Sequence, residues 1–390
     1  MGLGAGLFLS ITAQAAQGQP PLHHTPSATC ANCHQQIYDQ WAGSMHANST
    51  ALNDPIHGAF YQMLMGSPHE EGLKAKNGKF PVCLQCHAPN AARDGKTKLD
   101  TMPAYAEGVN CVVCHTMTKA KGPIANAQLG AKAYEFSSDS LQGPSGSFSG
   151  SNLAVSPGSN GAMMVNPFPH QAQSELFRSS DLCLGCHDTR NNGKGVPVCA
   201  TGPEVVKSGN TVTCQSCHMP MVDGVANHSM VGGHDPNMVK RGVVFALQGE
   251  KGKATVQLKN TLPHNLPTGA PFRNMTIRVT AFNAQGQPVW RNFKKNIFKE
   301  DPKSVMMLYL VGKDGKPAPP PKASQIAKDT RLKPGESRDI VYEIPVAGAT
   351  RVRAELYYDL LPPPMKKKFD KMIPAPLKQS ALVAFAEANL

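Results

Sequence analysis

The stretch Cys30-Ala31-Asn32-Cys33-His34 decides how the rest of this 390-residue chain is interpreted. It has the form C-x-x-C-H, and the same form recurs at residues 83–87, 111–115, 183–187 and 214–218. At the Cys and His frequencies of this chain, about 0.01 such motifs are expected by chance. Five copies are therefore not accidental, and they set the class of the protein.

The spacing inside each motif matches the attachment of a c-type haem. Two thiols three residues apart lie on one face of a helical turn, so each can add to one haem vinyl group as a thioether. The histidine that follows is then placed to ligate the iron. We predict five covalent haem c groups, attached through Cys30, Cys33, Cys83, Cys86, Cys111, Cys114, Cys183, Cys186, Cys214 and Cys217, with His34, His87, His115, His187 and His218 as first iron ligands.

Other uses of paired cysteines fit this pattern less well. A disulfide framework would not place a histidine after every second cysteine, and a zinc ribbon needs no such histidine. A thioredoxin-type site would occur once. Cys199 lies outside the motifs. We interpret it as a buried, unreactive thiol, with an intermolecular disulfide or a sulfur next to a haem as alternatives.

Nine of the 14 histidines lie outside the motifs, and five second ligands are needed if each iron binds two histidines. Methionine is another possible second ligand, but most of the 17 Met residues resemble ordinary core or loop positions. For every spare histidine the alternative is a solvated or hydrogen-bonded ring. From local context we predict as second ligands His46, His57, His170, His228 and His264, with His234 as a further candidate. We interpret His23 and His24 as part of a leader and His69 as a surface residue.

The formal net charge of +12 raises the question of a nucleic-acid partner. Five haems would bring about ten propionate charges, which brings the complete protein close to neutral. We therefore expect no nucleic acid and instead expect redox proteins as donor and acceptor.

The first residues predict an export signal over residues 1–15. An apolar stretch at 2–12 precedes Ala13-Gln14-Ala15, a small-x-small cleavage pattern, although no Lys or Arg precedes it. This stretch is too short to span a bilayer, and no later one is long enough. We expect a protein of the periplasm or cell surface that is not integral to the membrane. Association with a membrane or a surface complex remains open.

The fold class that we predict is mixed. Residues 25–238 form a loop-rich, mainly α-helical pentahaem domain, and residues 240–362 an all-β, immunoglobulin-like sandwich. A C-terminal tail follows at 363–390, with a short Ala/Leu-rich helix near 380–388. Motif spacing predicts that the second and third motifs, and the fourth and fifth, pack as local pairs. The predicted strands are 243–248, 254–259, 275–283, 288–293, 305–311, 337–344 and 351–360.

Several residues outside the motifs resemble the cytochrome c-554 family of multihaem cytochromes. The first motif is followed by Trp41, Ser44 and His46; the third is preceded by 107–110; and the fifth is followed by Met219-Pro220 and His228-Ser229. This resemblance covers residues 25–235. The segment 264–269 resembles the start of a β-sandwich appended to several bacterial multihaem cytochromes.

The resemblance implies stacked haems with mostly bis-histidine ligation and electron transfer in the periplasm or at the cell surface. It supports His46 and His228 as ligands and implies that His264 reaches back from the sandwich to a haem. The named family member is tetrahaem and receives electrons from hydroxylamine oxidoreductase. Because this chain has five motifs, that partner is not carried over.

Three functions are compatible with the sequence. The first, which we prefer, is an electron carrier. The second is a redox enzyme for a nitrogen or sulfur oxyanion or hydroxylamine, which needs one iron with an open position. No C-x-x-C-K variant or catalytic cluster indicates it. The third is a structural haem subunit of an extracellular electron-transfer complex or filament, with the sandwich as the docking module.

Overall fold

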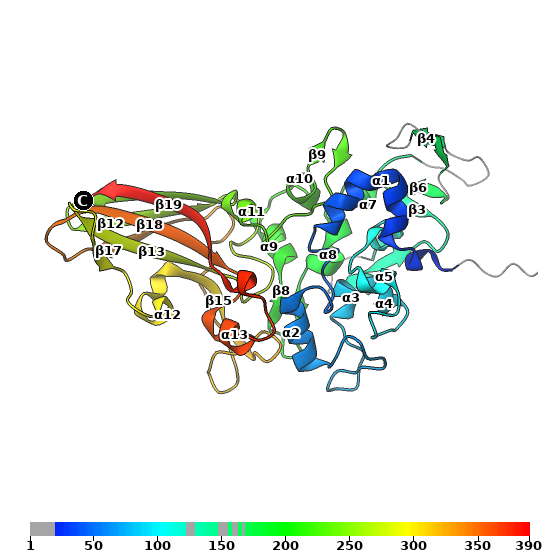
Figure 1. The fold of residues 1–390 in the computed structure, drawn as a ribbon, viewed down its shortest axis with the longest axis horizontal. Helices are drawn as coiled ribbons and strands as arrows, with labels where there is room; N and C mark the ends of the chain where they lie inside the picture. The colour runs from blue at the N-terminus through cyan, green and yellow to red at the C-terminus, as the bar shows by residue number, and fades with distance from the viewer. Residues whose placement is uncertain (1–19, 122–128, 147–154, 158–162, 166–167) are drawn as a thin grey trace, which may run out of the picture.

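The computed structural model describes residues 20–121, 129–146, 155–157, 163–165 and 168–390. The predicted export signal lies outside these residues. The described chain divides into a helical part that carries the motifs and a β part that ends at the C-terminus (Figure 1). Within the described residues, no helix has the length and apolar character needed to cross a membrane.

The motif-bearing part is built from short helices joined by loops. Its helices are α1 (Ser27–Ala42), α2 (Pro55–Leu64), α3 (Leu84–His87), α4 (Pro89–Arg93), α5 (Pro103–Ala106), α6 (Cys111–Cys114), α7 (Ser174–Phe177), α8 (Asp181–His187), α9 (Thr201–Ser208), α10 (Cys214–His218) and α11 (Pro236–Lys240), with 3-10 turns η1 (Leu22–His24) and η3 (Gly130–Ala133). Each motif lies on or at the start of one of these helices, which places its two cysteines on one face.

Small two-stranded pairs connect the helices of this part. They are β1 (Met117–Ala120) with β2 (Tyr134–Phe136), β3 (Leu141–Gly143) with β6 (His170–Ala172), β4 (Val155–Pro157) with β5 (Met163–Val165), β7 (Arg190–Asn191) with β8 (Pro197–Cys199), and β9 (Met221–Val222) with β10 (Val225–Ala226). The β3–β6 pair is parallel. The Ser- and Gly-rich segment 137–161 contains strands β3 and β4 where the structure describes it.

Local sequence explains where the motif helices begin and bend. Asn110 caps α6, because its side chain accepts a hydrogen bond from the backbone N–H of Val113 at 3.3 Å. Helix α1 is interrupted at His34, which has φ −124° and ψ 46°. The first motif therefore ends at a kink rather than inside a regular helix.

The β part consists of two antiparallel sheets. One has the order β11-β12-β17 and the other the order β16-β15-β13-β18-β19, with β14 also paired to β13. Their bounds are β11 (Val243–Glu250), β12 (Lys253–Asn260), β13 (Asn274–Asn283), β14 (Pro288–Arg291), β15 (Val305–Val311), β16 (Gln325–Asp329), β17 (Ser337–Glu343), β18 (Ala349–Asp359) and β19 (Ala381–Asn389). Val256 and Leu356 alternate with half-buried neighbours, and together with the fully buried Ile277 they belong to the core of this part.

The predicted fold class is confirmed, with one element wrong. All seven predicted strands are present, but the predicted helix near 380–388 is strand β19, which pairs with β18 from Tyr358↔Ala381 to Arg351↔Asn389. One edge of strand β18 pairs with β13, and the other edge is free to pair with this segment. The hydrogen bonds and packing gained there outweigh the preference of the alanines for a helix. Sequence analysis also missed strand β16, whose residues are all exposed.

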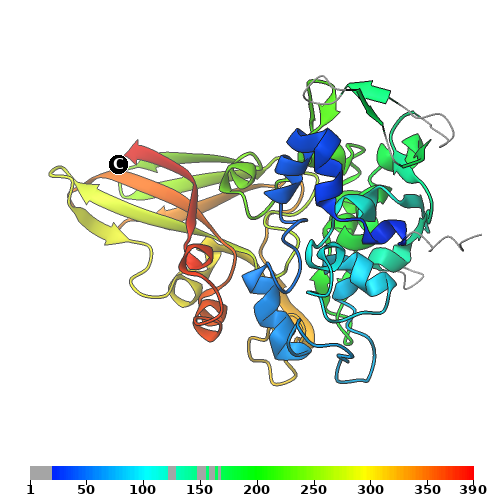
Figure 2. The same ribbon diagram turned by 45° about the vertical axis from the view of Figure 1, so that its right-hand side comes forward.

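The two parts pack against each other through α2 and α13 (Pro363–Lys368), which lie side by side in both views (Figures 1 and 2). Phe60 of α2 stacks on Phe272 with ring centroids 5.3 Å apart and meets Phe369 edge-on at 5.1 Å. A second link is the ion pair of Glu204 in α9 with Arg331, at 2.7 Å. The motif-bearing part is therefore held firmly on the β part.

Candidate haem-attachment sites

The cysteines of the five motifs are available for covalent attachment. All eleven cysteines of the chain carry free, half-buried thiols. No motif cysteine forms a disulfide, so both sulfur atoms of each motif can form thioethers with a haem. This donor set fits five haem c groups.

Thiols from different motifs contact one another. Three pairs of thiols, each joining two motifs, lie close enough to shift each other's pKa: Cys30 with Cys111, Cys86 with Cys186, and Cys183 with Cys214. In addition, Cys114 lies close enough to Cys183 and Cys186 to raise the pKa of both. The third motif therefore adjoins the first and the fourth, and the fourth adjoins the second and the fifth.

This adjacency differs in part from the pairs predicted from spacing. The predicted contact of the fourth and fifth motifs is present. The second motif places its thiol against the fourth motif rather than the third, and the third places one of its thiols against the first. Chain distance alone does not determine these contacts, since helices α1, α3, α6 and α8 come together through the tertiary fold.

Backbone carbonyls fix the orientation of three motif histidines. The Nδ1–H groups of His87, His115 and His218 donate to carbonyl oxygens of Ser49 at 2.9 Å, Gln142 at 2.7 Å and Val231 at 2.6 Å. A ring that donates from Nδ1 keeps the lone pair of Nε2 for a metal. The Nε2 atoms of these three rings are therefore free to bind iron.

Four spare histidines follow the same pattern. The Nδ1 atoms of His57, His228 and His264 bond to backbone carbonyls at 2.7 to 3.0 Å, and that of His46 lies 2.8 Å from the sulfur of Met230. Among the described residues, none of these four rings uses Nε2 in a hydrogen bond. The Nε2 of His57 is buried and without any partner.

The other spare histidines use their rings differently. His23 and His24 direct Nε2 to Asp94, and the Nε2 of His234 accepts from Arg273 at 2.7 Å. His69 is an exposed ring paired with Asp100. Hydrogen bonding thus separates the candidate ligands from histidines engaged elsewhere.

His170 has a distinct setting. It lies on β6, paired with Leu141 of β3. A Cβ atom at Gly143 would stand 2.6 Å from Nε2 of His170. The ring therefore needs a glycine at 143 to occupy its place.

Burial keeps the candidate ligands neutral. Desolvation lowers the pKa of His46 to about 3 and that of His115 to about 4. It also lowers the pKa values of His187, His228 and His264. A neutral imidazole is the form that ligates a metal, so the environment favours coordination over protonation.

Two pairs of rings have the separation that a shared iron requires. Rings on opposite faces of one metal have centroids roughly 6 Å apart, given metal–nitrogen bonds of about 2 Å. His46 and His187 are 5.9 Å apart, and His115 and His228 are 6.3 Å apart. His264 lies near enough to His218 for that ring to lower its pKa.

His57 departs from this geometry. Its ring centroid is only 3.8 Å from that of His87, and both Nδ1 atoms donate to the carbonyl of Ser49. Because both rings approach one oxygen, both Nε2 atoms point away from it, side by side. In this structure His57 lies beside His87 and not across from it, and its role as a second ligand stays a prediction.

Several residues of the site gave no signal in the sequence. Ser49, Gln142 and Val231 act through backbone carbonyls, which any residue type supplies. Cys199 lies on β8 opposite Arg190 and near Cys86 of the second motif, and burial raises its pKa to about 11. Its thiol is half-buried and lies beside a haem-attachment cysteine.

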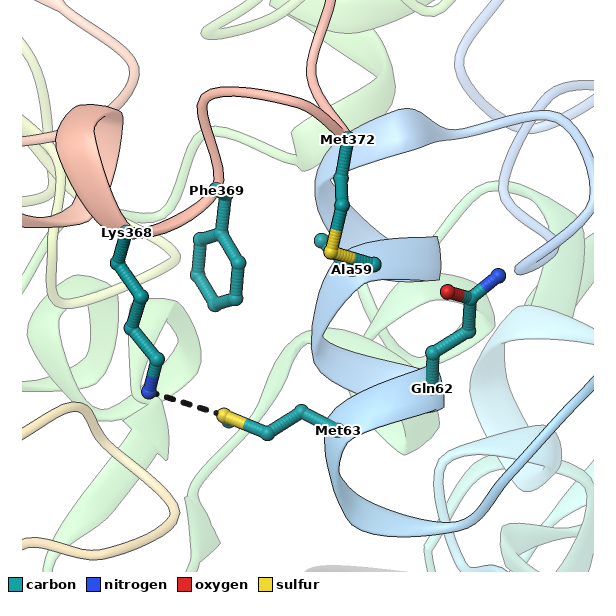
Figure 3. A pocket seen from close by; sticks show the side chains of 6 residues that line it. All are labelled: Ala59, Gln62, Met63, Lys368, Phe369 and Met372. Atoms are coloured by element: carbon teal, nitrogen blue, oxygen red, sulfur yellow. Dashed lines mark hydrogen bonds between the residues drawn. The ribbon is translucent and has the colours of Figure 1, made fainter.

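A surface pocket lies apart from these residues. It measures about 350 Å³ and is open, between α2 and α13, with Ala59, Gln62, Met63, Lys368, Phe369 and Met372 around it (Figure 3). None of these six residues belongs to a motif or is a histidine. The chemistry of the chain is therefore expected at the motifs and not in this pocket.

Comparisons with known proteins agree with this arrangement. Residues 29–116 match the model of the family described as cytochrome c554 and c-prime. Among solved structures, a penta-heme cytochrome c552 from Thermochromatium tepidum superposes with a TM-score of 0.88 at 45% sequence identity, over 95% of this chain and 100% of that chain. No curated protein matches the sequence.

Proposed function

The chain belongs to the family of multihaem c-type cytochromes that includes penta-heme cytochrome c552, and on that premise we propose that it transfers electrons between redox proteins through five covalent haem c groups. The predicted family and cofactor are thereby confirmed. Each haem, when bound, supplies an iron that exchanges one electron between its ferrous and ferric states. The residues of this chain hold the haems, orient their ligands and bring them together.

We propose a second histidine for four of the five irons. His46 is proposed to lie opposite His187 and His228 opposite His115, supported by ring separations of 5.9 and 6.3 Å. His264 is proposed opposite His218, supported by their electrostatic proximity. His170 is then left for His34; both lie near His115. Ligation by two histidines gives lower reduction potentials than ligation by His and Met.

The observation that carries the electron-transfer proposal is the contact between thiols of different motifs. Electron exchange between centres is fast only when they approach closely. The proximity of Cys30 to Cys111, Cys86 to Cys186 and Cys183 to Cys214 places the attachment points of neighbouring motifs next to one another. The proposed route runs from the first motif through the third to the fourth, and from there to the second or the fifth.

Rapid mixing tests this proposal. The fully reduced holoprotein is mixed with one equivalent of a one-electron oxidant, and the visible spectrum is followed. The oxidising equivalent is expected to reach its equilibrium distribution among the five haems within the mixing time, whichever haem is oxidised first. Slow, separate phases that persist for seconds would contradict a connected set of haems.

A second function, redox chemistry on a small molecule at the second motif, is supported by one specific observation. His57 shares a carbonyl with His87 and lies beside it, so within the described residues no spare histidine takes the opposite place. We propose that this iron has an open or weakly held position. One high-spin signal per chain in electron paramagnetic resonance, abolished by cyanide, would support it; five low-spin haems would remove it.

We further propose that the protein acts in the periplasm or at the cell surface. The predicted export signal at residues 1–15 supports this location, as does the covalent haem chemistry. Fractionation of cells that produce the full chain tests it. Haem-bearing protein that remains in the cytoplasm would count against it.

A further inference from the structure

Three side chains outside the motifs converge near the start of the described chain. His23 and His24 lie on η1, and Asp94 follows α4 as its C-cap residue. Nε2 of His23 is 2.8 Å from one carboxylate oxygen of Asp94, and Nε2 of His24 is 2.6 Å from the other. From the sequence both histidines are interpreted as part of a leader, and the proposed electron transfer gives them no role.

The convergence is built by the surrounding structure. Side chains of consecutive residues normally diverge, yet these two rings meet at 4.4 Å, nearly perpendicular, with both Nε2 atoms aimed at one carboxylate. Leu22 anchors η1 by its burial. The segment that follows is tied to the loop before α6, where Ser27 N–H donates to Glu107 and Asn110 donates to the carbonyl of Thr25.

The geometry points to a binding site for one divalent transition-metal ion of the zinc and copper class, held by His23, His24 and Asp94. Two imidazole nitrogens and a carboxylate oxygen within 4.8 Å of one another form the donor set. Imidazole donors suit Zn²⁺, Cu²⁺ and Ni²⁺, whereas Mg²⁺ and Ca²⁺ require oxygen ligands. Water completes the coordination, and each Nε2 proton moves to Nδ1 or to solvent as the metal binds.

The neighbours of the cluster suit a metal. Tyr105, which is buried, donates its hydroxyl to Oδ2 of Asp94 at 2.5 Å and so holds the carboxylate in orientation, as second partners of metal ligands do. The guanidinium of the neighbouring Arg93 is engaged elsewhere: it lies 4.1 Å over the ring of Phe136 and donates to Thr116. The side chains of His23, His24 and Asp94 are 13%, 23% and 24% exposed, which leaves an entry path from solvent.

Occupancy would have a mechanical effect distinct from electron transfer. The metal would join η1, which leads into α1 and the first motif, to the end of α4, which follows the second motif. This inference does not depend on the proposed electron route, because the three ligands belong to no motif.

Isothermal titration of the holoprotein, freed of loose metal with a chelator, tests the site with Zn²⁺ alone. We expect one Zn²⁺ per chain with micromolar or tighter affinity, and at least a tenfold loss of affinity in Asp94→Asn and in His24→Gln. The matched control is Asp100→Asn, which breaks the exposed His69–Asp100 pair and is expected to leave the affinity unchanged. The haem-to-protein ratio and visible spectrum verify that each variant is folded, and His23→Gln replaces any variant that is not.

Two outcomes would overturn the inference. One is the absence of stoichiometric Zn²⁺ binding to the wild-type protein, which would make the cluster a hydrogen-bonded clamp only. The other is equal affinity in the wild-type protein and in the folded variants, which would place the metal elsewhere on the surface.

Discussion

The imidazoles of His57 and His87 lie 3.8 Å apart, centroid to centroid, and both donate Nδ1–H to the carbonyl oxygen of Ser49. One ring belongs to the second motif and the other does not. A histidine across an iron would stand roughly 6 Å away. In this structure His57 therefore packs against the ring of His87, and we predict that it does not act as its opposite partner.

His57→Ala is expected to leave the number of high-spin haems unchanged. The substitution removes a buried ring and one hydrogen bond to Ser49, but no iron ligand. His46→Ala is the matched contrast, because His46 stands 5.9 Å from His187, and it should convert one low-spin haem to high spin. Electron paramagnetic resonance of both oxidised variants makes the comparison. A new high-spin signal in His57→Ala would restore His57 to the ligand set.

His264→Ala should leave five haems attached and turn one of them high-spin. His264 comes from the loop after β12, and its Nε2 is free for a metal because Nδ1 bonds to the carbonyl of Asn265 at 3.0 Å. His234→Ala is the control, since its Nε2 is occupied by Arg273. Spectra and haem content of both variants are compared with the wild type. Identical spectra for His264→Ala and wild type would exclude this ligand.

Gly143→Ala is expected to displace His170. The added methyl group would stand 2.6 Å from Nε2 of His170, which is closer than real contacts allow. Gly193→Ala is the control, because nothing lies within 4 Å of a Cβ there. The displaced ring should produce a high-spin signal or a five-coordinate visible spectrum. A variant indistinguishable from wild type would show that His170 ligates no iron.

Phe60→Ala should weaken the joint between the two parts of the molecule. Phe60 is 9% exposed and contacts Phe272 and Phe369, so its loss should cost about 3 kcal/mol. Phe385, which is 59% exposed, supplies the control Phe385→Ala, for which the expected cost is below about 1 kcal/mol. Guanidinium titration followed by far-ultraviolet circular dichroism measures both. Equal midpoints for the two variants would mean that the α2–α13 contact contributes little.

The sequence predicted features that depend on neighbouring residues. Each C-x-x-C-H motif is complete within five consecutive residues. The alternation of apolar and polar residues at 276–282 can likewise be seen in the sequence alone. Features that depend on distant residues were harder to predict. No local pattern shows that Cys86 meets Cys186, or that His57 and His87 share one carbonyl. Strand β19 was mistaken for a helix because its alanines favour helices locally, while the edge of β18 that it completes lies earlier in the chain.

The contacts among the motif thiols also define a network with a branch. The fourth motif touches or adjoins three others, whereas the first, second and fifth each adjoin one. A linear chain of motifs would have two ends. This arrangement has three ends, which are the first, second and fifth motifs. The second and fifth motifs connect to the others only through the fourth. On the proposed electron route the fourth motif is therefore a branch point, from which electrons arriving from the third motif can pass to the second or the fifth, and loss of the fourth haem would separate the other motifs into three groups.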